Sequence, residues 1–541
     1  MTARTLTASR SVMDATLPFA LPIGLSAFLL FTIEPLVGRL VLPVFGGGPM
    51  VWATVLCFFQ VLLVAGYAYG HLSVTRFGRW GPPLHLALAG LALFALFQAP
   101  SAISASSARS AIDGIRSLVG LIGLPAFVLA ASTPLLSSWL AAAGPEREGD
   151  PYWLYALANG GSLLALLAYP LVIEPRLGLG AQRLVWTIAF GALALLLARA
   201  ALRAMPDMAR RPRPSWIGVE ETQARAADVI DWPRRGRWLL LAAVPSGLLS
   251  AVTNFIATDL LSAPLLWVVP LGIYLVSLIL AFSPRAGRLI GWAAVATPAA
   301  VTLLWVPHVA AAAWPILAVL GLELIGYGVI ATGLHGRLAR DRPHAAHLTD
   351  FYLTLATGAA LGSAFVAVVA PTFFPDIWEY PILLVGALAA LALVARTPDA
   401  TAAQGLTFRP FVARLPGRVL PYAVGAALLG ALLFLSASPA LMVGIAWLAI
   451  GGLILVVGGR PWFLALSAAV VLVLAAFVLQ PTEFRGRSFF GVTRVVRSAD
   501  SGLTVLISGT TVHGSQWIDP GKHRMPTAYY GPGGPAEDIF T

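Results

Sequence analysis

The stretch LPFALPIGLSAFLLFTIEPLV, residues 17–37, carries a single charged side chain, Glu34, in an otherwise apolar run. A helix needs about 20 such residues to cross the hydrocarbon core of a bilayer. The run is too long for the apolar part of a cleaved signal peptide, and it continues into Arg39 without a small-residue cleavage site. We therefore predict that it is the first membrane span.

Comparable apolar runs recur through most of the 541 residues. We predict fifteen spans, at about 17–37, 50–70, 82–99, 117–143, 152–172, 183–203, 238–258, 264–282, 289–307, 311–333, 350–370, 379–395, 419–437, 440–458 and 461–480. Charged residues make up only 11% of the chain, against roughly 25% in soluble domains. This excludes a soluble enzyme, a disordered chain and a disulfide scaffold. The predicted fold class is an all-α polytopic membrane protein of 14–15 transmembrane helices.

Basic residues set the predicted orientation. The formal net charge is +11, and Lys522 is the only lysine among 35 basic residues. The arginines lie between apolar runs, so we expect a bilayer rather than a nucleic acid as partner. With the N-terminus inside, twenty-one arginines fall in inside loops and five outside, as the positive-inside rule requires. If the last three spans all cross, the C-terminal tail lies outside; if one is re-entrant, it lies inside.

An internal repeat divides the first twelve spans into two sets of six. Glu34 near the end of one helix is followed by PMVW over 49–52 and RFGR over 76–79. About 200 residues later, Asp259 is followed by PLLW over 264–267 and RAGR over 285–288. This order predicts a six-plus-six repeat like that of major facilitator transporters.

Helices five and eleven also correspond, because each begins with an aromatic pair and continues into small residues. We expect Gly160, Gly161, Gly358 and Gly362 to let neighbouring helices approach closely. The predicted organisation is a first six-helix half at 1–204, an inside linker at 205–237, a second half at 238–396, extra helices at 397–480 and a β-rich segment at 481–541.

Ionisable residues inside spans are candidates for function because they are costly to bury. For Glu34 and Arg39 we expect an interfacial salt bridge or a cap, and for Asp259 a position within reach of water. Glu323 lies in the middle of its run, with Tyr327 one turn later. Glu323 should face a cavity, a partner helix or a bound cation, or remain protonated. Cys57 is the only cysteine, and no cluster has metal-ligand spacing.

The composition changes after Gln480. Residues 488–497 and 503–507 are predicted strands, and 510–516 is a possible third; turn signals separate them. Two or three strands form a marginal domain that needs support from the membrane part, from another chain or from sequence missing from this one.

Several strings in the chain resemble bacterial fused transporter-like spermidine synthases, which join a membrane part to a synthase module. They are IEPLVGR over 33–39, FGGGPMVW over 45–52, HGRLAR over 335–340, HLTDFY over 347–352, RSFFGV over 487–492, GTTVHGSQ over 509–516 and PTAYY over 526–530. The resemblance implies substrate-contacting roles for Gln516, Tyr529 and Tyr530, with His513 as a further candidate.

The same resemblance implies a Rossmann-like aminopropyltransferase domain after the strands. That domain would bring a loop for decarboxylated S-adenosylmethionine and a catalytic Asp. The chain as given holds neither, so we assign no catalytic residue and no cofactor of its own. We expect a chain that is truncated, frameshifted or completed by a second chain, with a homo-oligomer as another option.

Three functions remain open from the sequence. The first is a membrane-embedded spermidine synthase-like protein of polyamine metabolism that is catalytically incomplete. The second is a major facilitator-type transporter for a cation such as a polyamine. The third is a membrane scaffold that docks a catalytic subunit. All three place the chain in the bacterial inner membrane with a cytoplasmic N-terminus.

Overall fold

The helices and strands were traced in a computed structural model of the chain. It describes residues 3–45, 49–98, 116, 118–143, 151–210, 230–260, 267–283, 286–309, 315–394, 482–488, 491–498, 501–508, 511–527, 531 and 534. The extra spans expected over 397–480 and most of the expected linker lie outside the described residues.

The contacts of the chain divide it into two compact units. Unit 1 comprises Met1–Ser246, Leu271–Trp292 and Ala331–Gly362, and unit 2 comprises Gly247–Pro270, Ala293–Ile330 and Ser363–Thr541. The borders fall inside helices, so several helices of the second predicted half contribute one end to each unit. These helices are α10 (Trp232–Phe255), α11 (Val268–Ala281), α12 (Gly287–Val309), α13 (Ile316–Arg340) and α14 (Leu348–Ala364).

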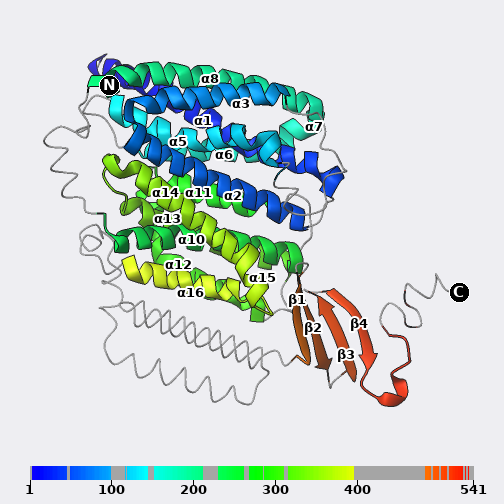
Figure 1. The fold of residues 1–541 in the computed structure, drawn as a ribbon. Helices are drawn as coiled ribbons and strands as arrows, with labels where there is room; N and C mark the ends of the chain where they lie inside the picture. The colour runs from blue at the N-terminus through cyan, green and yellow to red at the C-terminus, as the bar shows by residue number, and fades with distance from the viewer. Residues whose placement is uncertain are drawn as a thin grey trace, which may run out of the picture. The chain divides into compact units, whose positions relative to one another are not determined.

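Unit 1 contains the helices of the first predicted half, which run roughly alongside one another in Figure 1. They are α1 (Ala3–Phe45), α2 (Pro49–Leu72), α3 (Gly81–Gln98), α5 (Leu124–Ala143), α6 (Trp153–Ala168), the short α7 (Glu174–Arg176) and α8 (Leu179–Arg210). Helix α1 packs against α5, α6 and α8, and α2 packs against α5. The indole of Trp186 on α8 donates a 3.0 Å hydrogen bond to the carbonyl of Leu29 on α1.

The apolar composition of these helices explains their form. A bilayer offers no hydrogen-bond partners to the backbone, so a spanning segment satisfies its own amides as a helix. Within the described residues, eight helical segments are long and apolar enough to cross a membrane, and two shorter apolar helices accompany them. Large apolar side chains such as Leu195 and Phe94 lie on the outer surface, which suits contact with lipid. The expected multi-span helical architecture is confirmed.

Close helix packing occurs at equivalent places in the two predicted halves. A Cβ added at Gly161 on α6 would lie 2.5 Å from the carbonyl oxygen of Gly24 on α1, and one at Gly358 on α14 would lie 2.6 Å from that of Leu239 on α10. Gly362 is equally tight against Ala243, whereas Gly160 has open space. Three of the four expected glycines therefore permit close helix approach.

Unit 2 ends in a four-stranded antiparallel sheet of order β1-β2-β3-β4, preceded along the chain by η8 (Phe365–Val369), α15 (Ala370–Phe373) and α16 (Glu379–Val394). The strands are β1 (Phe484–Ser488), β2 (Gly491–Ser498), β3 (Leu503–Ser508) and β4 (Thr511–Trp517). Phe484 pairs with Val495 and Val496 with Val505, and the β3–β4 register shifts between Leu506 and Ile507.

The strand prediction needs a correction at its start. The strand expected over 488–497 corresponds to β2, which begins at Gly491, and β1 before it was not predicted. The missed strand has the sequence FRGRS, which lacks the apolar alternation that marks a half-buried strand. Its arginines instead form ion pairs, as described below.

Candidate functional site

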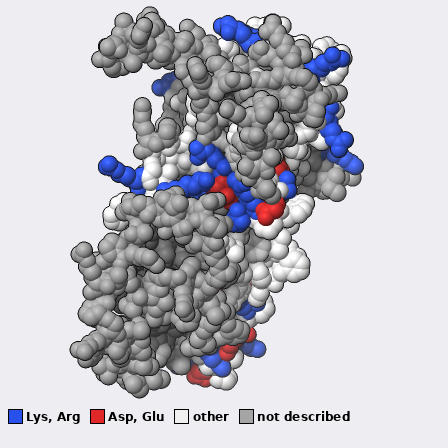
Figure 2. Space-filling view, turned by 90° about the vertical axis from the view of Figure 1, so that its left-hand side faces the viewer, with Lys and Arg blue, Asp and Glu red and all other residues white. Residues whose placement is uncertain are grey.

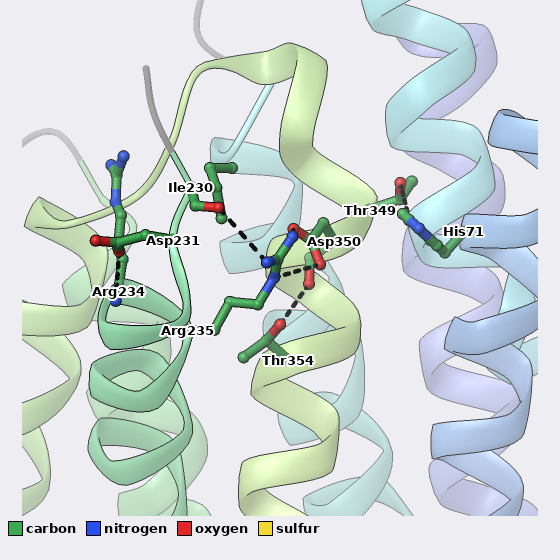
Figure 3. A network of polar contacts seen from close by, with 8 residues as sticks. All are labelled: His71, Ile230, Asp231, Arg234, Arg235, Thr349, Asp350 and Thr354. Carbon is green, nitrogen blue, oxygen red and sulfur yellow. Dashed lines mark hydrogen bonds and ion pairs between the residues drawn. The ribbon is translucent and has the colours of Figure 1, made fainter. Parts of the chain in front are cut away.

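The N-terminus of α10 carries an arginine that is held by a carboxylate at the start of α14 (Figure 3). The Arg235 guanidinium donates to both carboxylate oxygens of Asp350, with Nη2 2.8 Å from Oδ2 and Nε 3.2 Å from Oδ2 and 3.4 Å from Oδ1. The side chains are 29% and 18% exposed. Asp350 lies in the first turn of α14, where a helix N-terminus favours negative charge.

The residue before Asp350 reaches the first predicted half. The Thr349 hydroxyl lies 3.0 Å from Nδ1 of His71, which is in the last turn of α2 (Figure 3). Thr354 donates a 2.8 Å hydrogen bond to the Asp350 carbonyl and supports the same turn. Adjacent residues of α14 therefore contact both the second half, through Arg235, and the first half, through His71.

A second carboxylate at this end joins α10 to α13. Asp341, directly after α13, forms ion pairs with Arg234 at 3.3 Å and with Arg237 at 3.2 Å. The Asp341 carbonyl also accepts hydrogen bonds from Arg234 and from the indole of Trp238. We name the set of Arg234, Arg235, Arg237, Asp341 and Asp350 the inside arginine cluster, after its predicted orientation.

The end of the molecule that carries this cluster is rich in charge. Figure 2 shows basic side chains with a few acidic ones among them, on the side from which α10 and α14 begin. Arg76 and Arg79 are exposed on the turn after α2, and Gly78 within that turn has a φ of 52°, a left-handed conformation that suits glycine.

Aromatic rings from both predicted halves meet beside the cluster in unit 1. The ring of Tyr352 on α14 stacks on Tyr155 of α6, with centroids 5.0 Å apart, and meets Tyr152 edge-on at 5.8 Å. Tyr67 of α2 lies 6.4 Å from Tyr352. The Arg342 guanidinium lies 5.7 Å from the centroid of the Tyr152 ring, which is a cation–π distance.

In unit 2, the expected mid-span carboxylate faces a partner helix. Glu323 on α13 accepts a 2.5 Å hydrogen bond at Oε2 from the hydroxyl of Tyr380 on α16. Both residues and Tyr327 are fully buried, and the ring of Phe255 stacks on Tyr380 with centroids 6.3 Å apart. Of the options left open for Glu323, the structure places it against a partner helix.

Arg39 and Asp259 are two further intramembrane candidates. Arg39 forms a 2.8 Å ion pair with Glu174 and not with Glu34, so the expected Glu34–Arg39 bridge is wrong. Five residues of helix separate those two side chains by about 140°, which turns them to different faces. The side chain of Asp259 lies outside the described residues, and its backbone belongs to a short π-helix, Ile256–Leu260.

The tail residues implied by the synthase resemblance form no assembled site among the described residues. Gln516 and His513 are exposed on β4, and the Gln516 amide donates to the carbonyl of His523 at 3.4 Å. Tyr529 and Tyr530 lie outside the described residues. The part of the chain that the structure describes holds no group of three residues suited to a metal ion.

Sequence reasoning missed Tyr380 and the inside arginine cluster. From the sequence, the arginines at the start of α10 indicate only the orientation of the chain in the membrane. The available clue was Asp350, an acidic residue in a predicted helix start. Nothing in the sequence indicated which arginine it pairs with, because Arg235 is 115 positions away.

Comparisons with known proteins give only distant likenesses. No protein-family model and no curated protein matches the chain. Similar solved structures include the human organic anion transporter MFSD10, 15% identical with a TM-score of 0.42, which covers 70% of this chain and 99% of its own. The major facilitator proton:xylose symporter XylE is 16% identical with a TM-score of 0.44, covering 70% and 94%. A bacterial homologue of the iron transporter ferroportin is 16% identical with a TM-score of 0.45, covering 70% and 97%.

Proposed function

We propose that the chain is a transporter of the major facilitator type that moves a cationic small molecule, such as a polyamine, across the membrane. The observation that carries the proposal is the meeting of the two predicted halves at one end of unit 1. There His71 contacts Thr349, and Tyr155 stacks on Tyr352. A transporter of this class works by rocking one half against the other, so contacts at one end close that end.

The contacts between the two halves are of a kind that can break, so the closed end of the transporter can open again. The ion pairs of the inside arginine cluster join helices within the second half, so a rocking movement of one half against the other leaves them intact. Between the halves, the described contacts include a hydroxyl–imidazole hydrogen bond, stacked and edge-on aromatic rings, and the Arg342–Tyr152 cation–π contact. A neutral hydrogen bond of this kind contributes about 1 kcal/mol, which a change of state can break and re-form.

Glu323 is the residue that we propose to bind the cation. A carboxylate far from water inside a span is costly unless it is paired or protonated. The Tyr380 hydroxyl supplies one hydrogen bond to Oε2, and an ammonium group of a substrate is a suitable partner for the carboxylate. In a transporter coupled to protons, a proton bound to Glu323 would neutralise the carboxylate in place of the ammonium group.

Uptake of labelled putrescine into proteoliposomes tests this proposal. We expect Glu323→Gln to lower the uptake rate at least about tenfold, because the amide cannot offset the charge of an ammonium. The matched control is Glu174→Gln, which removes a partly exposed carboxylate from the Arg39 pair and should retain most uptake. Uptake indifferent to Glu323→Gln would remove the cation role.

The second candidate is the synthase-like membrane protein, and the β1–β4 meander is the observation that favours it. In that reading decarboxylated S-adenosylmethionine is the donor, and a separate chain docked on this one supplies the Rossmann-like catalytic domain. The purified chain alone should give no thioether product from putrescine and the donor. Clear turnover would overturn the expectation that the chain is catalytically incomplete.

A further inference from the structure

Three arginines join the sheet of unit 2 to the start of α16 and to the turn before it. Arg487 on β1 forms a two-pronged pair with Glu379, at 2.7 and 2.8 Å, and also donates to the Asp376 carbonyl. Arg485 and Arg494 both reach the Asp376 carboxylate, at 2.9 and 2.8 Å. Figure 1 draws β1 beside α15 and the start of α16. We name these five residues the sheet arginine cluster.

The centre of this cluster is buried. The Glu379 side chain is 1% exposed and that of Arg487 is 9% exposed. A two-pronged arginine–carboxylate pair sets direction as well as distance. Glu379 also opens α16, where the helix dipole favours a carboxylate. The pair therefore fixes the first turn of the helix.

The next residue along the chain is Tyr380, the hydrogen-bond donor to Glu323. Successive residues of a helix point about 100° apart. Once Glu379 is held by the sheet, the direction of the Tyr380 side chain is set too. A series of contacts thus connects β1, through two adjacent residues of α16, with the buried carboxylate on α13. All of these residues belong to unit 2.

We propose that the C-terminal sheet is an outside docking domain that holds the first turn of α16 and so positions Tyr380 against the cation-binding Glu323. The role in positioning rests on the proposed transport function, whereas the docking does not. Glu379 and Arg487 are then positioning residues, because they act on Glu323 only through Tyr380.

The same docking decides the side on which the tail lies. In the predicted orientation α14 leads outward, so the turn before α16 is outside. An ion-paired sheet must share that side. The docking therefore favours the alternative in which all three spans expected over 397–480 cross the membrane, because that alternative places the tail outside. A sheet on that side would not meet a cytoplasmic catalytic chain.

Labelling of single cysteines in intact cells tests the side. Cys57→Ser provides a background without cysteine, because Cys57 is the only one. Thr511→Cys reports on the sheet, with Gly178→Cys as the outside control and Thr75→Cys as the inside control; all three positions are exposed. We expect a membrane-impermeant maleimide to label the cysteines at positions 511 and 178 to a similar extent. If the cysteine at position 511 were labelled only after permeabilisation, like the cysteine at position 75, the outside placement of the sheet would be overturned.

Transport kinetics test the positioning role. We expect Arg487→Met to raise the KM for putrescine about tenfold, as Tyr380→Phe should; because Arg487→Met also leaves Glu379 buried without its partner, uptake is normalised to the amount of folded protein in the membrane. Arg487→Lys should recover part of the loss because it keeps the charge. The matched control is Arg497→Met, on the neighbouring strand, whose partner Glu483 is exposed. Equal KM values for Arg487→Met and Arg497→Met would overturn the positioning role.

A readout without transport keeps the docking testable if putrescine is not a substrate. We expect a protease added from outside to remove the sheet faster in Arg487→Met than in Arg497→Met. Equal rates would overturn the docking. Faster removal together with absent uptake in the unaltered protein would retain the docking and count against the proposed function alone.

Discussion

The inside arginine cluster and the sheet arginine cluster both consist of arginine–carboxylate ion pairs, but the two clusters differ in how far their side chains are buried. In the first, Arg235 and Asp350 are 29% and 18% exposed; in the second, Arg487 and Glu379 are 9% and 1% exposed. Water and salt screen the first pair, whereas the second sits in a medium where an unpaired charge is costly. The buried pair should therefore contribute more to stability than the partly exposed pair, although both are arginine–carboxylate pairs.

The largest effect should follow from breaking the buried pair. We expect Glu379→Gln to lower the free energy of unfolding by about 3 kcal/mol, because Arg487 then keeps a buried charge without its partner charge. The measurement is the apparent melting temperature in detergent. Glu483→Gln, which removes the exposed carboxylate that pairs with Arg497, is the control and should leave that temperature nearly unchanged.

A smaller effect should follow at the inside arginine cluster. We expect Asp350→Asn to cost about 1 kcal/mol of unfolding free energy, because the pair is partly exposed and therefore screened. Uptake should also fall, since the turn that presents Thr349 to His71 loses its support. A loss as large as that of Glu379→Gln would contradict the comparison.

Salt should separate the two clusters further. Raising the ionic strength from about 0.1 M to about 1 M shortens the screening length from about 10 Å to about 3 Å. We expect the stability difference between Asp350→Asn and the unaltered protein to shrink with salt, while that of Glu379→Gln persists. Melting temperatures at both salt concentrations provide the check, and equal salt sensitivity would count against a difference in burial.

The smallest effect should come from Arg497→Met. Its partner Glu483 lies 3.4 Å away, and the two side chains are 57% and 47% exposed. Exposed pairs of this kind contribute between zero and about 1 kcal/mol. We expect a change in unfolding free energy below about 0.5 kcal/mol, measured in the same melting experiment. A melting temperature lowered by several degrees would show that the pair contributes more to stability than its exposure indicates.

Much of the fold was predictable from the sequence, because a span needs only a run of apolar residues. Gly161 and Gly358 were also predictable as sites of close packing, since small residues at regular helix positions serve that purpose. β1 was not predictable, because FRGRS has no apolar alternation and is held by ion pairs with a helix start more than 100 positions earlier.

The candidate site was predictable only in part. Glu323 stood out because a carboxylate in the middle of a span is rare and costly. Its partner Tyr380 did not stand out, since tyrosines are common and several others also lie within predicted spans. Arg39 shows the same limit, because its partner is Glu174 and not the nearer Glu34.

The sequence alone determined that most of this chain belongs in lipid and ends in a short polar segment of strands. Both follow from the amino-acid composition of successive stretches of the chain. In a bilayer an apolar stretch must form a helix, because its backbone can satisfy its hydrogen bonds only locally. Only the tertiary structure decided which polar groups meet, including the Arg487–Glu379 pair that joins β1 to α16 and the hydrogen bond from Tyr380 to Glu323. The physical reason is that pairing depends on distance in three dimensions, which separation along the chain does not encode.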